Sequence, residues 1–393
     1  MRIISGVHIL FVLELVLIAT VLPCFSAEPG IIYSNPQVYN VEYSFEMYPD
    51  PNKVDRDKDL KLWIPIPREW DSQKAVKIVS VEPEPHGKYV DPEHGNPMLF
   101  WDFGKEPEKP SYNVNLKYRL EQYEVNAKID PNRIGPYNKT NRDYMLYTRS
   151  TNTISITEKV RELARTAVGD EKNPYLQAKR IYKFVRKKIR RGGEASGFRR
   201  LRGISVKALL EFPVTDQKTG EEYYKGMCAE SSMFFIALCR AVGIPARAVF
   251  VFYPDLRLLS QDAKASKLIR KSLSPDGLSA DIIHGIFAHV RPEFYLPGYG
   301  WIPVDPYKRE FAYSNNNIVI VSKGIDIKIG PNAPQKENEG YGIMWIGLNS
   351  GKADCLWPDV RNIAKIHKAD VKIIYHPDPF PAEASVEYGT QQR

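Results

Sequence analysis

Cysteine is scarce in this chain: its 393 residues include four, and none belongs to a CxxC pair or a Cys/His cluster. The spacing therefore offers no metal site, and we predict neither a metal nor another cofactor. If Cys24 is removed with the N-terminal segment, an odd number of thiols remains, Cys228, Cys239 and Cys355. At least one thiol then stays unpaired within a monomer. Cys239 follows Cys228 by about three helical turns, too far to form a disulfide, and is expected to be a small buried apolar residue.

Long apolar runs are also rare, and the N-terminus carries the main one. Residues 1–27 begin with Arg2, continue through the apolar run from Ile9 to Leu22 and close with small residues. This layout is typical of a secretory signal peptide, so we expect an extracytoplasmic protein, secreted or periplasmic. An uncleaved membrane anchor is the alternative, because residues 7–27 approach the roughly 20 needed to span a bilayer.

Acidic residues are outnumbered, 47 against 55 Lys and Arg, which gives a formal net charge of +8. Much of the excess lies in residues 183–202, where the one acid is Glu194. The simplest interpretation is a solvated helix end and loop. The alternative is a surface for an anionic partner outside the membrane, such as an acidic envelope polymer or lipid surface. Nucleic acid is disfavoured by the export signal, and the oligomeric state is left open.

The length exceeds one ordinary domain, and 43% hydrophobic residues supply ample material for a core. From Val38 to about Ile129 apolar residues alternate with polar ones, as in half-buried strands. We therefore predict an all-β, sandwich-like domain over residues 28–130. Short strand-like pieces and a Pro-rich tail predict a C-terminal extension over residues 331–393, with a disordered end.

The apolar period changes after a loop rich in Pro, Asn, Arg and Thr at residues 131–151. Helices are expected at 158–168, from Asn173 onward and at 228–242, and strands at 246–252, 285–295 and 301–305. The fold class is therefore α+β, with a helix that carries a thiol packed on a sheet that carries His and Asp. We assign residues 131–330 to this domain. Residues 256–280 are an insertion between strands that could act as a flexible lid.

The residues that could do chemistry follow one another in a distinctive order. Gly226-Met-Cys228 stands at the start of the third helix, where backbone N–H groups and the helix dipole favour a thiolate. A free thiol has a pKa of about 8.5 and is mostly protonated at neutral pH, so an adjacent imidazole is the usual means of activation. His289 and then Asp305 follow along the chain and could serve this thiol. The order predicts a cysteine-dependent acyl-transfer enzyme.

Four ordered motifs resemble the transglutaminase-like superfamily, which includes transglutaminases, peptide N-glycanases and many microbial thiol proteases. They are Gly226-Met-Cys228, Gly243-Ile-Pro-Ala-Arg247, His289-x-x-x-Glu293-x-Tyr295 and Gly300-Trp-Ile-Pro-Val-Asp-Pro306. The resemblance covers roughly residues 155–310 and implies a papain-like thiol enzyme core. The β domain before it looks like the one that often precedes this core in secreted microbial members.

The sequence departs from the family pattern at one place. Val290-Arg291-Pro292 stands where Ala-Trp-Val is usual. Proline cannot donate a ladder hydrogen bond, so Pro292 predicts an edge strand or a bulge.

The resemblance implies a role for each catalytic candidate. Cys228 would be the nucleophile, and His289 would hold the thiolate and later protonate the leaving amine. Asp305 would fix the ring tautomer and stabilise the imidazolium. The N–H of Cys228 and one more donor would bind the oxyanion, for which Tyr223 and Tyr224 are candidates, although packing is the simpler role.

Some neighbouring residues have simpler interpretations. His284 competes with His289, but the spacing to Glu293 and Tyr295 favours His289. Glu293 is expected to be a supporting or surface residue, and Tyr295 and Trp301 are expected to pack in the hairpin.

Three functions remain open at this point. The first is amide hydrolysis of a peptide or protein through a thioester, because water is the default acceptor. The second is cross-linking by transfer to an amine, which requires a site that excludes water. The third is a non-catalytic secreted binding module, for which Arg291-Pro292 is the one hint.

The hairpin between His289 and Asp305 carries a geometric condition. Residues opposite each other in an antiparallel pair point to the same face. An even loop would place Asp305 opposite Pro292 and turn it away from His289. If the two side chains cooperate, the hairpin must close through an odd loop or contain a bulge, with Asp305 opposite Arg291 or Glu293.

Overall fold

The computed structural model describes residues 30–49, 61–103, 111–191, 205–253, 288–327, 359–361 and 366–376. The predicted signal segment, residues 256–280, His284 and Cys355 lie outside these ranges. Within the part of the chain that is described, no helix combines the length and apolar character needed to cross a membrane.

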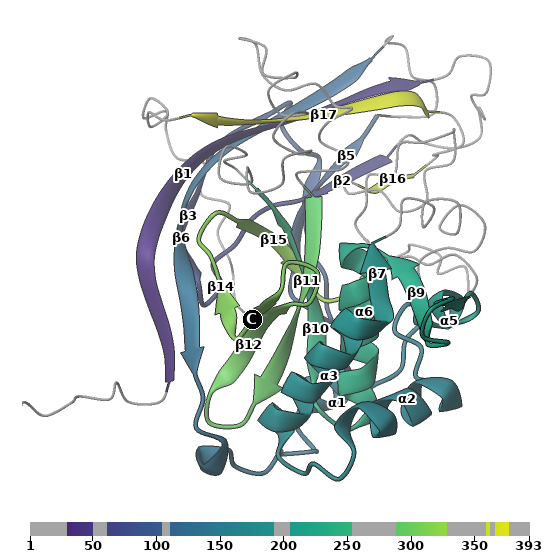
Figure 1. Cartoon of the computed structure of the whole chain (residues 1–393). Coiled ribbons are helices and arrows are strands. Elements are labelled where there is room, and N and C mark those ends of the chain that lie inside the picture. Colours follow the sequence, from purple (N-terminus) through teal and green to yellow (C-terminus); the bar gives the residue numbers. More distant parts are fainter. Residues whose placement is uncertain are drawn as a thin grey trace, which may run out of the picture.

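Two antiparallel sheets share an apolar core in the N-terminal half (Figure 1). The first has the order β14-β6-β1-β17, with β3 also paired to β6: β14 is Tyr313–Ser314, β6 Tyr112–Lys128, β1 Gly30–Pro49, β17 Ile366–His376 and β3 Gln73–Glu82. The second has the order β16-β2-β5-β4: β16 is Asp359–Arg361, β2 Lys61–Pro65, β5 Pro97–Asp102 and β4 Gly87–Val90. Alternate residues of β6 are buried, and this period of two builds the predicted sandwich-like packing.

Residues from the predicted C-terminal extension take part in this sheet. β17 pairs with β1 over most of its length, from Asn40 opposite His376 to Tyr48 opposite Lys368. The chain therefore returns to its N-terminal strand after the α+β region. The domain boundaries themselves stay a prediction.

The two longest helices before the thiol, α2 and α3, lie where apolar residues recur at helical spacing. The described helices are η1 Pro131–Arg133, α1 Arg142–Thr148, α2 Glu158–Val168, α3 Pro174–Lys188, α5 Val206–Leu210 and α6 Cys228–Ala241. α1 interrupts the stretch predicted to be a loop, so that prediction is wrong in its second half. The Asn141 side chain caps this helix by accepting hydrogen bonds from two backbone N–H groups, and the helix buries Leu146 and Tyr147.

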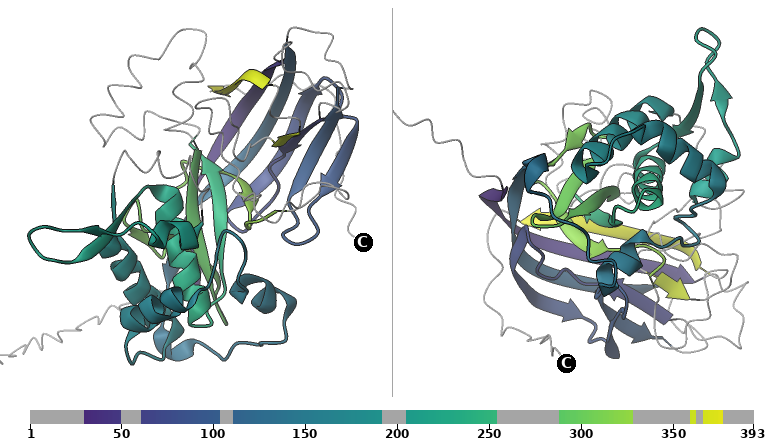
Figure 2. Two further views of the ribbon diagram at one scale, coloured as in Figure 1. Left: turned by 90° about the vertical axis from the view of Figure 1, so that its right-hand side faces the viewer. Right: turned by 90° about the horizontal axis from the view of Figure 1, so that it is seen from below.

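A third sheet lies between the helices and the first sheet, as the views in Figures 1 and 2 show. Its order is β13-β12-β11-β10-β15: β13 is Glu310–Phe311, β12 Gly300–Asp305, β11 Ala288–Leu296, β10 Ala246–Phe252 and β15 Val319–Lys323. Alternate residues of β10 enter different cores. Ala248 and Phe250 pack with α6, whereas Val249 and Val251 pack with the first sheet.

A small sheet precedes the buried helix. It has the order β7-β9-β8, with β7 Ile189–Arg191, β9 Glu222–Gly226 and β8 Val214–Thr215. β9 leads directly into α6 and so fixes where that helix begins.

β11 is a central strand without a bulge toward β10, so the edge or bulge predicted from Pro292 is wrong. Pro292 lies opposite Ala248, whose carbonyl accepts a hydrogen bond from the Gly324 N–H at 2.8 Å and thus points to the other neighbour. On the second side, pairing between β11 and β12 ends at Glu293 and Pro303. The missing N–H of Pro292 therefore falls where neither neighbouring strand requires a donor.

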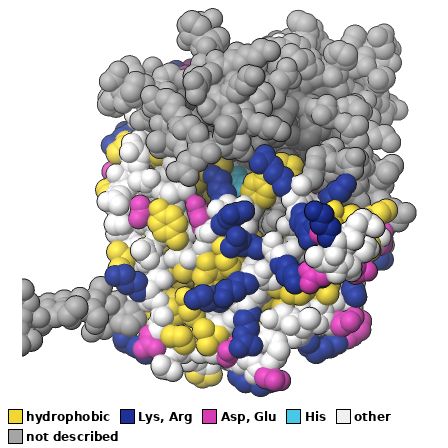
Figure 3. Space-filling model, in the orientation of Figure 1, with side chains coloured by type: hydrophobic (Ala, Val, Ile, Leu, Met, Phe, Trp, Pro, Cys, Tyr) yellow, Lys and Arg dark blue, Asp and Glu magenta, His cyan; other side chains and the backbone are white. Residues whose placement is uncertain are grey.

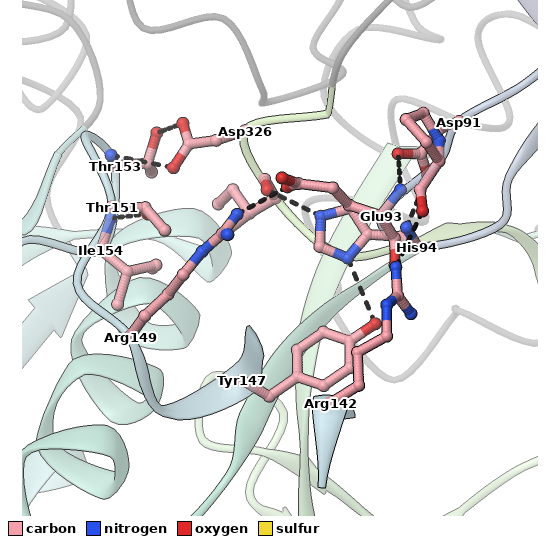
Figure 4. A network of polar contacts seen from close by, with 12 residues as sticks. Asp91, Glu93, His94, Arg142, Tyr147, Arg149, Thr151, Thr153, Ile154 and Asp326 are labelled. Atoms are coloured by element: carbon pink, nitrogen blue, oxygen red, sulfur yellow. Dashed lines mark hydrogen bonds and ion pairs between the residues drawn. The ribbon is translucent and has the colours of Figure 1, made fainter. Parts of the chain in front are cut away.

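The loop between β4 and β5 binds the α+β region through a polar network (Figure 4). The ring of His94 contacts the Tyr147 hydroxyl at 3.2 Å and the Ile325 carbonyl at 3.1 Å. Asp91 fixes this loop by accepting hydrogen bonds from the backbone N–H groups of Glu93 and His94. The β sandwich is thus fastened to α1 and to the segment after β15.

Candidate active site

Cys228 is the first residue of the buried helix α6. The chain leaves β9 at Gly226, and the Met227 N–H donates to the Glu230 carboxylate at 2.8 Å, which satisfies a backbone donor at the helix start. A Cβ on Gly226 would lie 2.7 Å from the Cβ of Glu230 and 3.1 Å from Ile189. This close approach explains the glycine two residues before the thiol.

His289 and Asp305 form a buried pair on β11 and β12. The Nε2 atom of His289 lies 2.5 Å from Oδ2 of Asp305, and the other carboxylate oxygen accepts the Lys308 N–H at 2.9 Å. The imidazole is 6% exposed and the carboxylate 1%, so the pair is shielded from water. Its charge interactions are correspondingly strong.

The hairpin of β11 and β12 closes through an odd loop, which is the condition for His289 and Asp305 to lie on one face. Leu296 pairs with Gly300, which leaves a three-residue loop, and the ladder continues to Glu293 and Pro303. The same register places Asp305 across from Arg291, on the face that bears His289. The prediction of an odd loop is confirmed.

Protonation of His289 is favoured by its two neighbours. Burial opposes the imidazolium and is the largest single influence, but the charge and hydrogen bond of Asp305, together with Cys228, outweigh it and raise the pKa of His289 to about 9. Because Nε2 faces Asp305, the Nδ1 atom is the one left for the thiol. The structure thus brings together the three residues singled out in the sequence.

Asp305 is held as a carboxylate. Burial would raise its pKa, but the imidazolium of His289, the Lys308 N–H and the charge of Arg291 lower it below the usual value. Asp305 can therefore orient the ring and compensate its charge.

Two tyrosines that the sequence did not single out flank the imidazole. The Tyr253 ring centroid lies 5.7 Å from that of His289, and the Tyr307 ring lies 6.3 Å away. Lys308 places its Nζ 3.8 Å from the Tyr253 ring centroid. Tyr307 and Lys308 directly follow the Asp-Pro of the hairpin motif, and that adjacency was the available signal.

Arg291 lies behind the His289–Asp305 pair and is 3% exposed. Its Nη1 donates a hydrogen bond to the Ser314 hydroxyl, whereas its buried Nε has no hydrogen-bond partner among the described residues. The residue that hinted at a surface for binding is thus an interior cation beside Asp305.

Glu293 is the centre of a buried ion cluster rather than a surface residue. Its carboxylate accepts from Lys323 Nζ at 3.0 Å and from the Arg247 guanidinium at 3.0 to 3.1 Å. Burial alone would raise the pKa of Glu293, but these cations lower it to about 2. Arg247 also stacks 3.8 Å above the Trp301 ring, and Trp301 packs on Tyr295 as expected for the hairpin. The cluster joins β10, β11 and β15 next to the site.

The remaining candidates contact neighbouring side chains. Cys239 is fully buried, and burial raises the pKa of its thiol, as expected for a core residue. Tyr224 packs on Phe234, and Arg190 stacks 4.1 Å above Tyr223.

The described part of the basic stretch is partly neutralised. Lys187 pairs with Glu221 at 2.6 Å, and Arg190 pairs with Asp216 at 2.5 Å. Among the described residues no cluster of His, Cys, Asp and Glu could hold a metal ion. The absence of a cofactor stays a prediction.

Comparison with known proteins shows what this region of the chain resembles. Residues 161–306 match the sequence profile of the Transglutaminase-like superfamily. An uncharacterized protein of Haemophilus influenzae is 29% identical over 253 residues, which are 62% of each chain, so the match spans less than two thirds of that relative.

Solved structures share the fold. A proposed cysteine protease from Cytophaga hutchinsonii superposes with a TM-score of 0.52 at 13% identity, over 90% of this chain and 95% of the other. The periplasmic domain of TgpA from Pseudomonas aeruginosa gives a TM-score of 0.28 at 14% identity, over 68% of this chain and 87% of the other. The predicted α+β fold, with its papain-like core, is confirmed.

Proposed function

We propose that this chain, whose core belongs to the transglutaminase-like superfamily, is an extracytoplasmic thiol-dependent amide hydrolase of the peptidase type. The observation that carries the proposal is the buried His289–Asp305 pair, which meets Cys228 at the start of a helix. A core histidine without function would have no need of a thiol on one side and a carboxylate on the other.

The proposed reaction begins with the Cys228 sulfur as a thiolate and His289 as an imidazolium. The sulfur attacks the amide carbon, and the carbonyl oxygen becomes an oxyanion that the Cys228 N–H at the helix start would stabilise. His289 then gives its proton to the departing amine, and a thioester remains. Asp305 keeps the ring oriented throughout.

Water completes the turnover. Neutral His289 takes a proton from a water molecule while the water oxygen attacks the thioester carbon. The bond between this carbon and the Cys228 sulfur then breaks, which releases the carboxylic acid. The thiolate and imidazolium are restored. Hydrolysis is preferred over transfer to an amine because water is the default acceptor, and no amine-selecting site is evident in the described residues.

A thiol-directed probe tests the proposal. Iodoacetamide should label Cys228 selectively in the folded protein and abolish amide cleavage. Cys228→Ala and His289→Ala should lose at least about a hundred-fold in rate, since nucleophile and base act as a unit. Cys239→Ser is the matched control and should retain turnover. Labelling of Cys239 instead of Cys228, or an active Cys228→Ala protein, would reject the nucleophile assignment.

Chelators test the prediction that no metal is needed. Activity should survive EDTA, because the thiol and imidazole supply both the nucleophile and the proton carrier. Loss of activity in EDTA that is restored by calcium or zinc would contradict this.

Export rests on residues 1–27 alone and is tested separately. N-terminal sequencing of protein recovered outside the cytoplasm should start near residue 28. An intact N-terminus in the membrane fraction would instead support the anchored alternative.

A further inference from the structure

We infer that the site prefers substrates with a carboxylate close to the reacting amide, and that Lys308 binds this carboxylate beside Cys228 and His289. The inference rests on the proposed function for the reaction but concerns which substrates are chosen. It is carried by the position of one half-buried ammonium group.

The geometry ties Lys308 to the site at both ends of the residue. Its N–H donates to Asp305 at 2.9 Å, which fixes the backbone next to the His289–Asp305 pair. Its Nζ lies 3.8 Å from the Tyr253 ring centroid, and that ring is 5.7 Å from the His289 ring. The ammonium is therefore held one aromatic ring away from the imidazole, in a cation–π contact.

Among the described residues, no carboxylate forms an ion pair with the Lys308 ammonium. Both oxygens of Asp305 are already engaged, by His289 and by the Lys308 backbone. The other nearby acid is Glu310, whose pKa is raised by burial and by the charge of Asp305. Burial lowers the pKa of Lys308 by more than the charges of Asp305 and Glu310 raise it, so the ammonium has lost hydration without full compensation by a direct ion pair.

A second cation lies near Tyr307, the other tyrosine beside the imidazole. The Arg191 guanidinium carbon is 6.0 Å from the Tyr307 ring centroid, and Tyr307 lies 6.3 Å from His289. Both tyrosines that flank the imidazole thus carry a basic side chain. Lys and Arg side chains gather on the face of the molecule that Figure 3 shows.

The charges at the site leave this rim positive. Cys228 and His289 balance as thiolate and imidazolium, and Arg291 compensates Asp305. The Lys308 ammonium remains without a carboxylate partner among the described residues, and peptides offer carboxylates as their usual anions. An acidic side chain next to the amide, or a terminal carboxylate, would meet Lys308 with a charge-assisted hydrogen bond.

Alkylation of Cys228 tests the inference without any substrate turnover. Iodoacetate and iodoacetamide both transfer their CH₂ group to sulfur with loss of iodide, and they differ in carrying a carboxylate or a neutral amide. The rate constant for iodoacetate divided by that for iodoacetamide should be larger for Cys228 than for a small free thiol. This ratio should fall about two- to five-fold in Lys308→Met, the effect of a half-exposed charge pair.

Arg309→Gln is the matched control, because Arg309 is the exposed neighbour with the same charge. Its alkylation ratio should stay at the wild-type value. Lys308→Glu should push the ratio below that of Lys308→Met, and near-ultraviolet circular dichroism checks that each variant is folded. A ratio that Lys308 variants leave unchanged would overturn the inference.

Peptides then identify the source of the carboxylate. Pairs with Glu or Gln on either side of the cleaved amide, each with a free or an amidated C-terminus, separate an acidic side chain from a terminal carboxylate. Lys308→Met should collapse the preference of the wild-type protein toward equal rates. An equal loss on acidic and neutral peptides would mean that Lys308 serves the thiol and not the substrate. If no peptide is cleaved, the alkylation ratio still decides the inference, whereas the proposed hydrolysis fails.

Discussion

Asp305→Asn isolates the charge of the buried carboxylate while it preserves the shape of the side chain. In the native site one oxygen of Asp305 faces Nε2 of His289 and the other accepts the Lys308 N–H. An asparagine has one carbonyl oxygen, so it can satisfy only one of these two donors. We expect the imidazole to lose its charge compensation, and we expect activity to fall with it.

The size of the effect follows from the pKa of His289. Its rise from 6.5 to about 9 corresponds to roughly 3 kcal/mol in favour of the imidazolium, at about 1.36 kcal/mol per pKa unit. Burial opposes protonation, so without Asp305 the ring should be mostly neutral at pH 7 to 8. We expect kcat/KM to fall by about two orders of magnitude, because the thiolate loses its imidazolium partner.

Two measurements separate this effect from a general loss of structure. A proton NMR titration of the His289 ring should move its pKa from about 9 to below the usual value in the variant. Because the folded-state pKa is raised, the stabilisation by this group is complete below about pH 6.5 and is lost as the pH rises through 9. The free energy of unfolding of the native protein, measured with urea, should therefore fall by about 3 kcal/mol between pH 6 and pH 10. The variant should not show this loss. A variant with native turnover and an unchanged His289 titration would refute the reasoning.

Two further changes test the supports of the site. Gly226→Ala should lower the free energy of unfolding by about 1 to 3 kcal/mol and slow alkylation of Cys228, because the new Cβ would collide with Glu230 at the helix start. Urea titration measures the first effect and the labelling rate measures the second. If neither changes, β9 can shift to make room for the methyl group. Glu293→Gln should lower the free energy of unfolding by about 3 to 5 kcal/mol, because it leaves Lys323 buried without its anion; an equal unfolding midpoint in both proteins would show that the ion cluster is dispensable.

Local signals made the core of the site predictable. α2 begins and ends at the predicted residues because Thr157 caps its first turn and Gly169 follows its last residue. β10 has its predicted limits, and α6 ends one residue early. Cys228 is the first residue of α6, His289 the second of β11 and Asp305 the last of β12, so the order of these elements along the chain indicated that the three side chains meet.

Non-local pairings were beyond the sequence. The partner of β17 is β1, more than three hundred residues earlier, and no local period indicates which strands pair. The interior position of Glu293 was missed for the same reason, since its partner Lys323 comes from another strand. The prediction of an edge strand from Pro292 was wrong because a missing N–H excludes a central position only where a neighbouring strand needs that donor.

The β sandwich should be indispensable to the α+β region, although the predicted boundary at residue 130 invites separation. The outer edge of β15 is completed by two side chains of the sandwich and not by a strand. The Gln73 amide donates to the Ile320 carbonyl at 3.0 Å and accepts the Ile320 N–H at 2.8 Å, and Asn96 does the same for Lys323 at 2.8 and 2.9 Å.

A chain of residues 131–330 would lose these four hydrogen bonds and would expose buried side chains of β10 and β15 that pack on the first sheet. The freed backbone groups would bond to water, so the cost comes mainly from the apolar side chains that become exposed, at about 1.5 to 3 kcal/mol for each fully buried one. Several such side chains together approach the whole stability of an ordinary domain. We expect this fragment to lack a cooperative urea transition and to label Cys228 and Cys239 alike, because both thiols become accessible. Residues 28–393 should show one transition and selective labelling. If the fragment unfolds cooperatively and still labels Cys228 alone, then the sandwich is a separable module and the contacts at the β15 edge do not hold the active site in place.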